Sequence, residues 1–201
     1  MQSMRSYKPY VEFRLTESRI GLETPDGENR FIEISPGSSF GAEHPTTRLC
    51  IKGLEEIFKK RIVKTVLDFG CGSGVLGICA ASLGAENVLA VDIDPAAVKE
   101  AKVNFERNKM NSIGHVQYGS KEDVRGRFEL IIANIVTDDL LALVDWFKSM
   151  LTEDGTLLVS GIYEMKEEAL VTGYIKAGFR VNKEYRESGW VAIWFESQQR
   201  A

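Results

Sequence analysis

Apolar residues of the chain occur in short runs separated by glycine-rich and polar turns, and the clearest run starts at Val63. The β-branched and apolar residues from Val63 to Phe69 predict a buried strand. Glycine occupies alternate positions in the turn that follows, which removes Cβ atoms from the backbone there. Small apolar residues then predict a helix packed close to a sheet. A strand, a glycine turn and a helix form the nucleotide-binding corner of a Rossmann-like fold.

Strands and helices continue to alternate toward the C-terminus. A short connection joins the last two strands, so we expect them to pair antiparallel. We therefore predict an α/β fold with a Rossmann-like seven-stranded, mainly parallel sheet, helices on both faces and a C-terminal antiparallel β-hairpin. The predicted helices are 46–60, 95–108, 137–151 and 165–177. The further predicted strands are 88–91, 115–118, 128–133, 156–160, 179–185 and 190–195, with connections at 153–155 and 186–189.

Residues 1–40 are less regular, and we predict a short N-terminal extension before a main domain over residues 41–201. Tyr7–Phe13, Arg19–Glu23 and Phe31–Ile34 have the composition of short strands, and a Thr-Pro-Asp-Gly turn lies between the last two. These strands would form a small antiparallel ribbon. A loose arm is the alternative.

Composition and charge narrow the function classes. The 201 residues suffice for one domain with a substantial core, and the net charge of −4 gives no overall basic field for nucleic acid. No signal peptide is visible, and no apolar run approaches the ~20 residues of a membrane span. Three cysteines without a C-x-x-C pair predict reduced thiols, hence a cytoplasmic protein. Because the chain has only two histidines, we expect no metal site.

The glycine turn leaves two ligand classes open. Gly72 to Gly77 match G-x-G-x-x-G, and Asp92 follows where a ribose ligand is expected, so a NAD-dependent oxidoreductase is one interpretation. Against a pyrophosphate, Asp68 precedes the glycines, and at ~4 Å its repulsion would be about 4 kcal/mol at an intermediate dielectric. The turn also has no basic residue. A cationic cofactor fits better: Asp68 would face positive charge and Asp92 both ribose hydroxyls, as S-adenosylmethionine requires.

Polar residues at two other places would complete this site. Asn134 follows the predicted strand 128–133, and ligands of open α/β sheets bind outside the carboxyl ends of strands. Its side-chain oxygen would accept a hydrogen bond from a substrate amine, or it would only cap the strand. The loop 35–47 carries hydroxyl groups at a helix start, which can bind a ligand carboxylate or simply cap the helix. Residues 119–123 would lie near an adenine edge.

Four motifs occur in a fixed order along the chain. They are Pro36-Gly37, Phe40-Gly41 and His44–Thr47 in the first loop, Asp68–Gly74, Val91–Pro95 and Ala133–Ile135. With these motifs the chain resembles the ribosomal protein L11 lysine methyltransferase (PrmA) family of class I S-adenosylmethionine-dependent methyltransferases. The likeness covers residues 31–195. The first loop departs from the family pattern because it is one residue shorter and carries Glu43.

This resemblance implies N-methylation of a protein, first of all a lysine of a ribosomal protein L11-like substrate. Asn134 would be the catalytic residue that borders the substrate nitrogen. The short extension offers no counterpart of the family's N-terminal recognition domain, so another protein, a nucleic acid base or a small amine stays open as the acceptor. A non-catalytic cofactor-binding module is a further alternative. The residues expected to bind S-adenosylmethionine or shape its pocket are Thr47, Asp68, Gly70, Gly72, Asp92 and Asn134.

Overall fold

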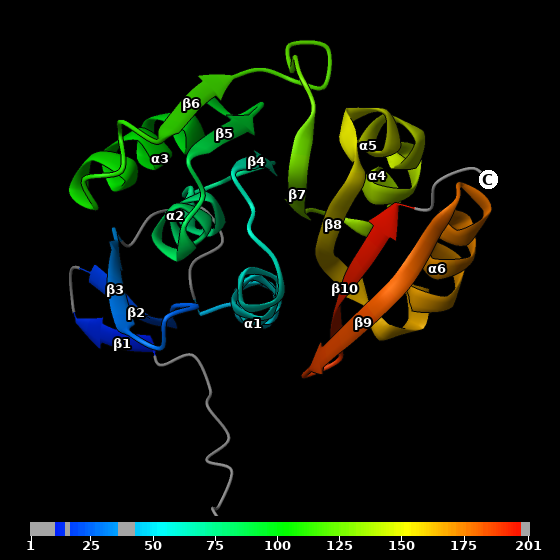
Figure 1. Ribbon diagram of the computed structural model, residues 1–201, viewed down its shortest axis with the longest axis horizontal. Helices are drawn as coiled ribbons and strands as arrows, with labels where there is room; N and C mark the ends of the chain where they lie inside the picture. The colour runs from blue at the N-terminus through cyan, green and yellow to red at the C-terminus, as the bar shows by residue number, and fades with distance from the viewer. Residues whose placement is uncertain (1–10, 15–16, 36–42, 198–201) are drawn as a thin grey trace, which may run out of the picture.

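The chain forms two sheets in a computed structural model that describes residues 11–14, 17–35 and 43–197. The larger sheet has seven strands in the order β6-β5-β4-β7-β8-β10-β9 (Figure 1). β10 runs antiparallel to β8 and to β9, and the other adjacent strands pair parallel, which confirms the predicted fold with its closing hairpin. The strands are β4 (Thr65–Phe69), β5 (Asn87–Asp92), β6 (Gly114–Tyr118), β7 (Phe128–Asn134), β8 (Leu151–Tyr163), β9 (Phe179–Glu187) and β10 (Trp190–Ser197).

Helices cover both faces of this sheet, with α1 to α3 on one side and α4 to α6 on the other (Figure 1). Side chains alternate across a strand, so neighbouring residues of the central strand enter different cores. Val66 packs with Ile78 on the α2 side, whereas Leu67 packs with Phe147 on the α5 side. The helices are α1 (Pro45–Lys60), α2 (Val75–Leu83), α3 (Pro95–Arg107), α4 (Thr137–Ala142), α5 (Val144–Met150) and α6 (Glu167–Lys176).

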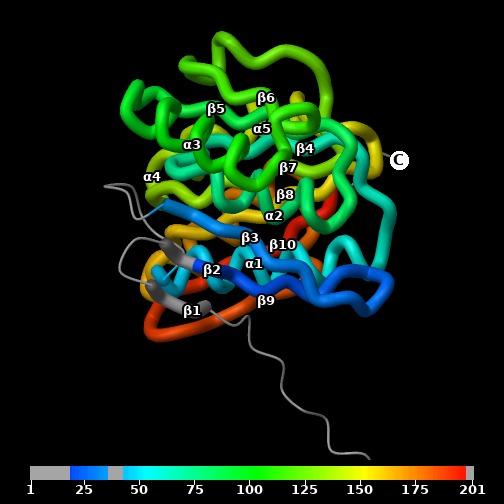
Figure 2. Tube along the Cα trace, turned by 90° about the vertical axis from the view of Figure 1, so that its left-hand side faces the viewer, coloured from blue at the N-terminus to red at the C-terminus, as the bar shows by residue number. Residues whose placement is uncertain are grey.

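A three-stranded antiparallel sheet, β1 (Val11–Arg14), β2 (Glu17–Glu23) and β3 (Asn29–Ile34), lies against α1 and α2 (Figures 1 and 2). Phe31 is 50% exposed, whereas four apolar side chains of β2 and β3 are buried and belong to the same core as α1 and α2: Ile20, Leu22, Ile32 and Ile34. Part of the predicted strand Tyr7–Phe13 lies outside the described residues. The division of the chain at residue 40 stays a prediction.

The predicted helix 137–151 is wrong in one respect, because the structure divides it into α4 and α5 at Leu143. The Leu143 N–H donates to both Asp139 O (3.0 Å) and Leu140 O (3.3 Å), and its φ of −101° and ψ of 0° depart from the ideal α-helical values. The predicted turn at 153–155 lies inside β8. There, Phe128 pairs with Leu151 but Leu130 pairs with Thr156, so extra residues of β8 are accommodated as an irregularity.

The C-terminal hairpin is tighter than the predicted connection 186–189. β9 continues to Glu187 and β10 starts at Trp190. Ser188 and Gly189 have φ of 52° and 79°, and two successive positive φ values are typical of the type I′ turn that matches strand twist.

The predicted helix 165–177 corresponds to a 3₁₀ turn, η1 (Glu164–Lys166), followed by α6. Within the described ranges, no helix has both the length and the apolar character needed to span a membrane.

Candidate cofactor and substrate cavity

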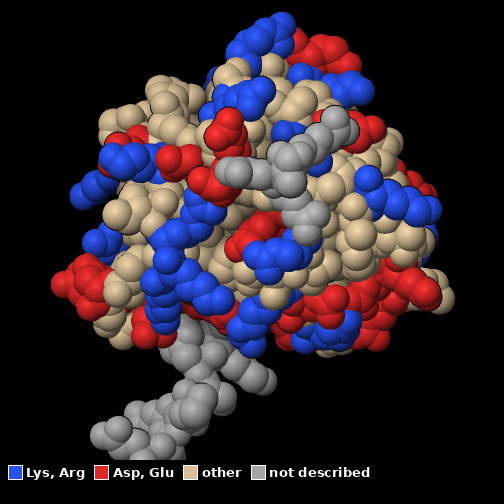
Figure 3. All heavy atoms as spheres, turned by 45° about the vertical axis from the view of Figure 1, so that its right-hand side comes forward, with Lys and Arg blue, Asp and Glu red and all other residues tan. Residues whose placement is uncertain are grey.

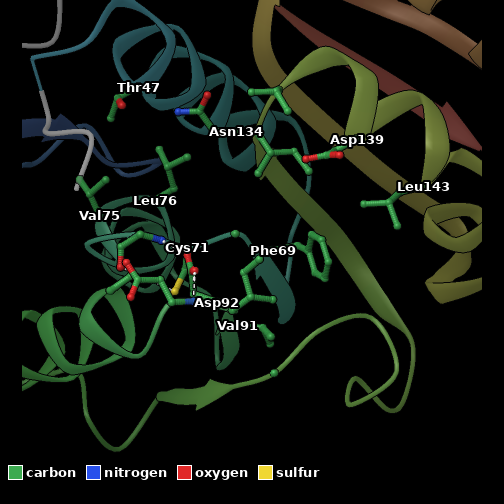
Figure 4. A pocket seen from close by; sticks show the side chains of 18 of the residues that line it. Thr47, Phe69, Cys71, Val75, Leu76, Val91, Asp92, Asn134, Asp139 and Leu143 are labelled. Atoms are coloured by element: carbon green, nitrogen blue, oxygen red, sulfur yellow. Dashed lines mark hydrogen bonds between the residues drawn. The ribbon is translucent and has the colours of Figure 1, made fainter. Parts of the chain in front are cut away.

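A cavity of about 640 Å³ opens at the carboxyl ends of β4, β5 and β7 (Figure 4). This edge is where ligands bind in open α/β sheets. The first turn of α1, the glycine turn, the start of α3 and one side of α4 complete its wall. Its lining residues are Thr47, Phe69–Gly72, Val75, Leu76, Val91–Asp94, Ala97, Gly119, Asn134–Val136, Asp139, Ala142 and Leu143.

The glycine turn between β4 and α2 is held against β5 by its own backbone. The N–H groups of Gly70 and Cys71 both donate to Val91 O, at 2.9 and 3.0 Å. Gly70 has φ of +71°, and a Cβ on it would lie 2.5 Å from Ile135 Cγ2, so the turn and the end of β7 approach too closely for a side chain. Burial raises the pKa of the Cys71 thiol, so this cysteine stays protonated and acts as a small apolar wall.

Asp92 lines the cavity and also fixes the glycine turn. Its Oδ2 accepts from the Gly72 N–H at 2.8 Å, and its Oδ1 accepts from the Asp94 N–H at 2.9 Å. A carboxylate has about four lone-pair sites, so these two bonds leave acceptor capacity for a ligand. Asp94 in turn caps α3 by accepting from the Ala96 N–H at 2.8 Å.

Asp68 is not among the residues that line the cavity, and its predicted role beside a cationic ligand stays a prediction. Its side chain is 1% exposed and lies beneath α2, where Oδ2 accepts from the Gly77 N–H at 2.8 Å. A Cβ on Gly77 would be 3.1 Å from that oxygen, so glycine makes room for the contact. Because adjacent strand residues face opposite sides, Phe69 borders the cavity instead. Burial raises the pKa of Asp68 to about 7, opposed by the Gly77 hydrogen bond.

Thr47 and Asn134 line the cavity from two different elements. Thr47 is in the first turn of α1, which His44 caps with its ring Nδ1, 3.4 Å from the Thr46 nitrogen. Asn134 ends β7 beside Ser160 of β8. Figure 4 shows the Asn134 side chain directed toward Thr47. The structure thus brings Thr47, Gly70, Gly72, Asp92 and Asn134 to one cavity, and leaves out Asp68.

Several residues that line the cavity were not predicted from the sequence. Ile93 and Val136 are 69% and 63% exposed, and large exposed apolar side chains beside a cavity often mark a binding surface. Ile93 directly follows β5 and Val136 lies two residues after β7, and these positions were the available signal. Asp139 and Leu143 reach the cavity only through the placement of α4 (Figure 4). Of the predicted segment 119–123, only Gly119 lines it.

The charged residues of the lining are all acidic. Asp92 and Asp94 lie on one side and Asp139 on the α4 side, and no Lys or Arg occurs among the described residues that line the cavity. Such a surface disfavours a pyrophosphate and favours a ligand that carries positive charge.

Comparison with known proteins identifies the family. A family model described as ribosomal protein L11 methyltransferase (PrmA) matches residues 2–198. The chain belongs to this family. Among curated PrmA-family relatives, the ribosomal protein L11 methyltransferase of Anoxybacillus flavithermus is 38% identical over 173 residues, and that of Clostridium perfringens 37% over 171 residues. These alignments cover 85% and 84% of this chain, but only 55% and 54% of the relatives. The chain thus spans about half the length of the curated relatives it matches.

A solved structure gives the same PrmA-family assignment. The ribosomal protein L11 methylase of Lactobacillus delbrueckii subsp. bulgaricus superposes with a TM-score of 0.70 at 32% identity, covering 79% of this chain and 82% of that one. A methyltransferase structure from Pyrococcus furiosus, at 19% identity and a TM-score of 0.61, shares the fold.

Proposed function

We propose that this chain transfers a methyl group from S-adenosylmethionine to a protein nitrogen, with a lysine of a ribosomal protein L11-like substrate as the first candidate. The observation that carries this proposal is the acidic cavity beside the glycine turn, with Asn134 among its lining residues. Family membership supports the same reaction. Because the chain spans only part of its relatives, the substrate that their names indicate is carried over as part of the proposal.

The residues present fit the proposed cofactor. The cavity volume of about 640 Å³ lies within the ~300–1,000 Å³ of ordinary ligand pockets. Asp92 retains acceptor sites for ribose hydroxyls, and Ile93, Val136 and Leu143 offer apolar surface for a flat base. The Thr47 hydroxyl would serve the methionine carboxylate. Bound there, S-adenosylmethionine would supply a methyl group that is already activated for transfer.

The role proposed for the chain itself is to position the acceptor amine. Asn134 would accept a hydrogen bond from that amine and direct its lone pair into the cavity, so that catalysis comes mainly from proximity and orientation. A lysine has a pKa of ~10.4 in water and must react as the neutral amine. The apolar walls at Ile93 and Val136 would favour that neutral form by excluding water.

The partner that we propose is a protein substrate. A cytoplasmic location stays a prediction. Cys50, Cys71 and Cys79 are buried free thiols in the structure. On the face shown in Figure 3, Lys and Arg side chains lie among Asp and Glu. The absence of a nucleic-acid surface also remains a prediction.

Calorimetric titration and methyl transfer test the proposal together. We expect S-adenosylhomocysteine to bind and NADH not to bind, because the lining offers carboxylates and no cation to a pyrophosphate. Labelled S-adenosylmethionine should then label purified ribosomal protein L11. Tight NADH binding without a response to S-adenosylhomocysteine would refute the proposal. Cofactor binding with labelling of other extract proteins but not L11 would refute only the proposed substrate.

A further inference from the structure

Asn104 of α3 joins two segments that are far apart in sequence. Its side chain is fully buried. Nδ2 donates to Ser73 O in the glycine turn at 2.9 Å, and Oδ1 accepts from the Ser35 N–H at 3.0 Å. Both ends of the amide are therefore used, one by the turn that lines the cavity and one by the residue directly after β3. Buried amides are satisfied in this way because an unpaired polar group is costly.

Small residues allow α3 to come close enough for this bridge. A Cβ on Gly74 would lie 3.1 Å from Ala101 Cβ and 3.1 Å from Phe105 Cε2, so the glycine turn rests directly on α3. Asn104 occupies the same helix face, one turn from Ala101. The contact at Ser73 O thus depends on a close approach that only glycine permits.

Asn108, the residue that caps the C-terminus of α3, makes the matching contact with β3, and its Nδ2 also donates to Asn104 O at 2.8 Å. Its Oδ1 accepts from the Glu33 N–H at 2.8 Å, and its Nδ2 donates to Glu33 O at 2.7 Å. The two asparagine side chains therefore hydrogen-bond the backbone of Glu33 and Ser35, as the backbone of a neighbouring strand would. Asn104 is fully buried and Asn108 only partly buried, and of the two only Asn104 binds the glycine turn.

We propose that Asn104 is a positioning residue that couples the glycine turn to the chain leaving β3, so that cofactor binding and order at Ser35 stabilise each other. The bond to Ser73 O holds the Ser73 carbonyl in place, and Gly72, the residue before it, lines the cavity. The chain leaving Ser35 leads on to α1, whose first turn supplies Thr47 to the same cavity. This inference rests on the proposed function, since it assumes that the turn holds the cofactor.

The matched variants are Asn104→Asp and Asn108→Asp. Each keeps the acceptor oxygen for β3 and replaces the donating amide by a carboxylate, so each weakens the contact between α3 and a backbone carbonyl. Only Asn104→Asp disturbs Ser73 O. Calorimetry with S-adenosylhomocysteine should give at least about tenfold weaker binding for Asn104→Asp, with KM for S-adenosylmethionine raised more than kcat is lowered. Asn108→Asp should stay within about twofold of the wild type, even where both variants lower Tm equally.

Amide hydrogen exchange on the wild-type protein tests the coupling without any variant. Linkage is reciprocal, so bound S-adenosylhomocysteine should slow exchange of the Ser35 N–H more than that of the Glu33 N–H. Equal affinities of both variants and the wild type, or no selective protection at Ser35, would overturn the coupling and leave the proposed function intact. Failure of the wild-type protein to bind S-adenosylhomocysteine would instead overturn the proposed function, and the coupling with it.

Discussion

The carboxylate of Asp68 accepts the backbone N–H of Gly77 at 2.8 Å and so caps α2 from the strand beside it. α2 begins after Gly74, which has no side chain to cap the helix, and Gly77 lies in the first turn. Asp68 satisfies one of the donors that every helix start leaves unpaired. Asp68 was expected to face the ligand, and in the structure it stabilises the start of α2, the helix that follows the glycine turn.

We predict that Asp68 makes the protein less stable as the pH rises from about 4 to 7. Its pKa is raised from 3.8 to about 7 in the folded state, so in that window the folded protein keeps a proton that the unfolded chain loses. The free energy of unfolding should therefore fall with increasing pH, by a few kcal/mol at most. Asp68→Asn should remove this slope while keeping an oxygen for Gly77, as measured by urea unfolding across the pH range.

Asp68→Ala is the complementary variant. It leaves the Gly77 N–H without its acceptor, so we expect it to be about 1–2 kcal/mol less stable than Asp68→Asn at every pH. A pH slope that persists unchanged in Asp68→Asn would show that another group causes it.

Glu55 should contribute a second, separable pH effect at the contact between α1 and β2. Its side chain is 5% exposed, its Oε1 accepts from the Glu23 N–H at 2.8 Å, and burial raises its pKa to about 7. The folded-state pKa is again above the ordinary value, so stability from this group is complete at low pH and declines as the pH approaches 7. Urea unfolding of Glu55→Gln should show a shallower decline than the wild type.

The double variant Asp68→Asn/Glu55→Gln gives the control. The two carboxyl groups share no hydrogen-bond partner in the structure, so their slopes should add. A double variant no flatter than either single variant would contradict this independence.

Much of the site followed from the sequence because strong local signals fixed it. Val63–Phe69 has the composition of a buried strand, and the glycines after it permit the positive φ found at Gly70, Gly72 and Gly74. Asp92 and Asn134 end their strands and hence lie at the ligand edge. The positions of Asp92 and Asn134 could be predicted because the amino-acid composition of a segment indicates where a strand ends.

The side chain of Asp68 could not be oriented in the same way. β4 is covered on both faces, so its apolar residues show no alternation that would tell which face Asp68 takes. Leu140, Leu141, Val144 and Phe147 likewise fit one continuous helix, and the break at Leu143 depends on local backbone bonding. The contribution of Asp139 to the cavity depends on the resulting position of α4.

Gly70→Ala should affect both stability and ligand binding, because the substitution adds a steric clash to the cost of a positive φ. The residue has φ of +71°, which costs about 1–2 kcal/mol for a non-glycine residue. Its Cβ would also lie 2.5 Å from Ile135 Cγ2, so the turn or the end of β7 must shift. We expect lower stability in urea and at least about tenfold weaker binding of S-adenosylhomocysteine.

Gly189→Ala is the matched control for Gly70→Ala. Gly189 has φ of +79°, and a Cβ there meets no atom within 4 Å. It should therefore show only the backbone cost and unchanged ligand affinity. Equal effects of the two substitutions on affinity would mean that the contact with Ile135 has no part in shaping the cavity.

Asn134→Ala should separate methyl transfer from cofactor binding. If Asn134 orients the acceptor amine, its loss should lower kcat about 100-fold, because misplacement of a reacting group by about 1 Å can cost that much. Affinity for S-adenosylhomocysteine should fall by less than tenfold, since the other residues proposed to hold the cofactor remain. Single-turnover transfer from labelled S-adenosylmethionine and calorimetry measure the two effects. Asn182→Ala is the control, because Asn182 lies on β9, donates to Glu196 Oε1 at 2.7 Å and does not line the cavity. Full transfer activity in Asn134→Ala would remove this residue from the proposed mechanism.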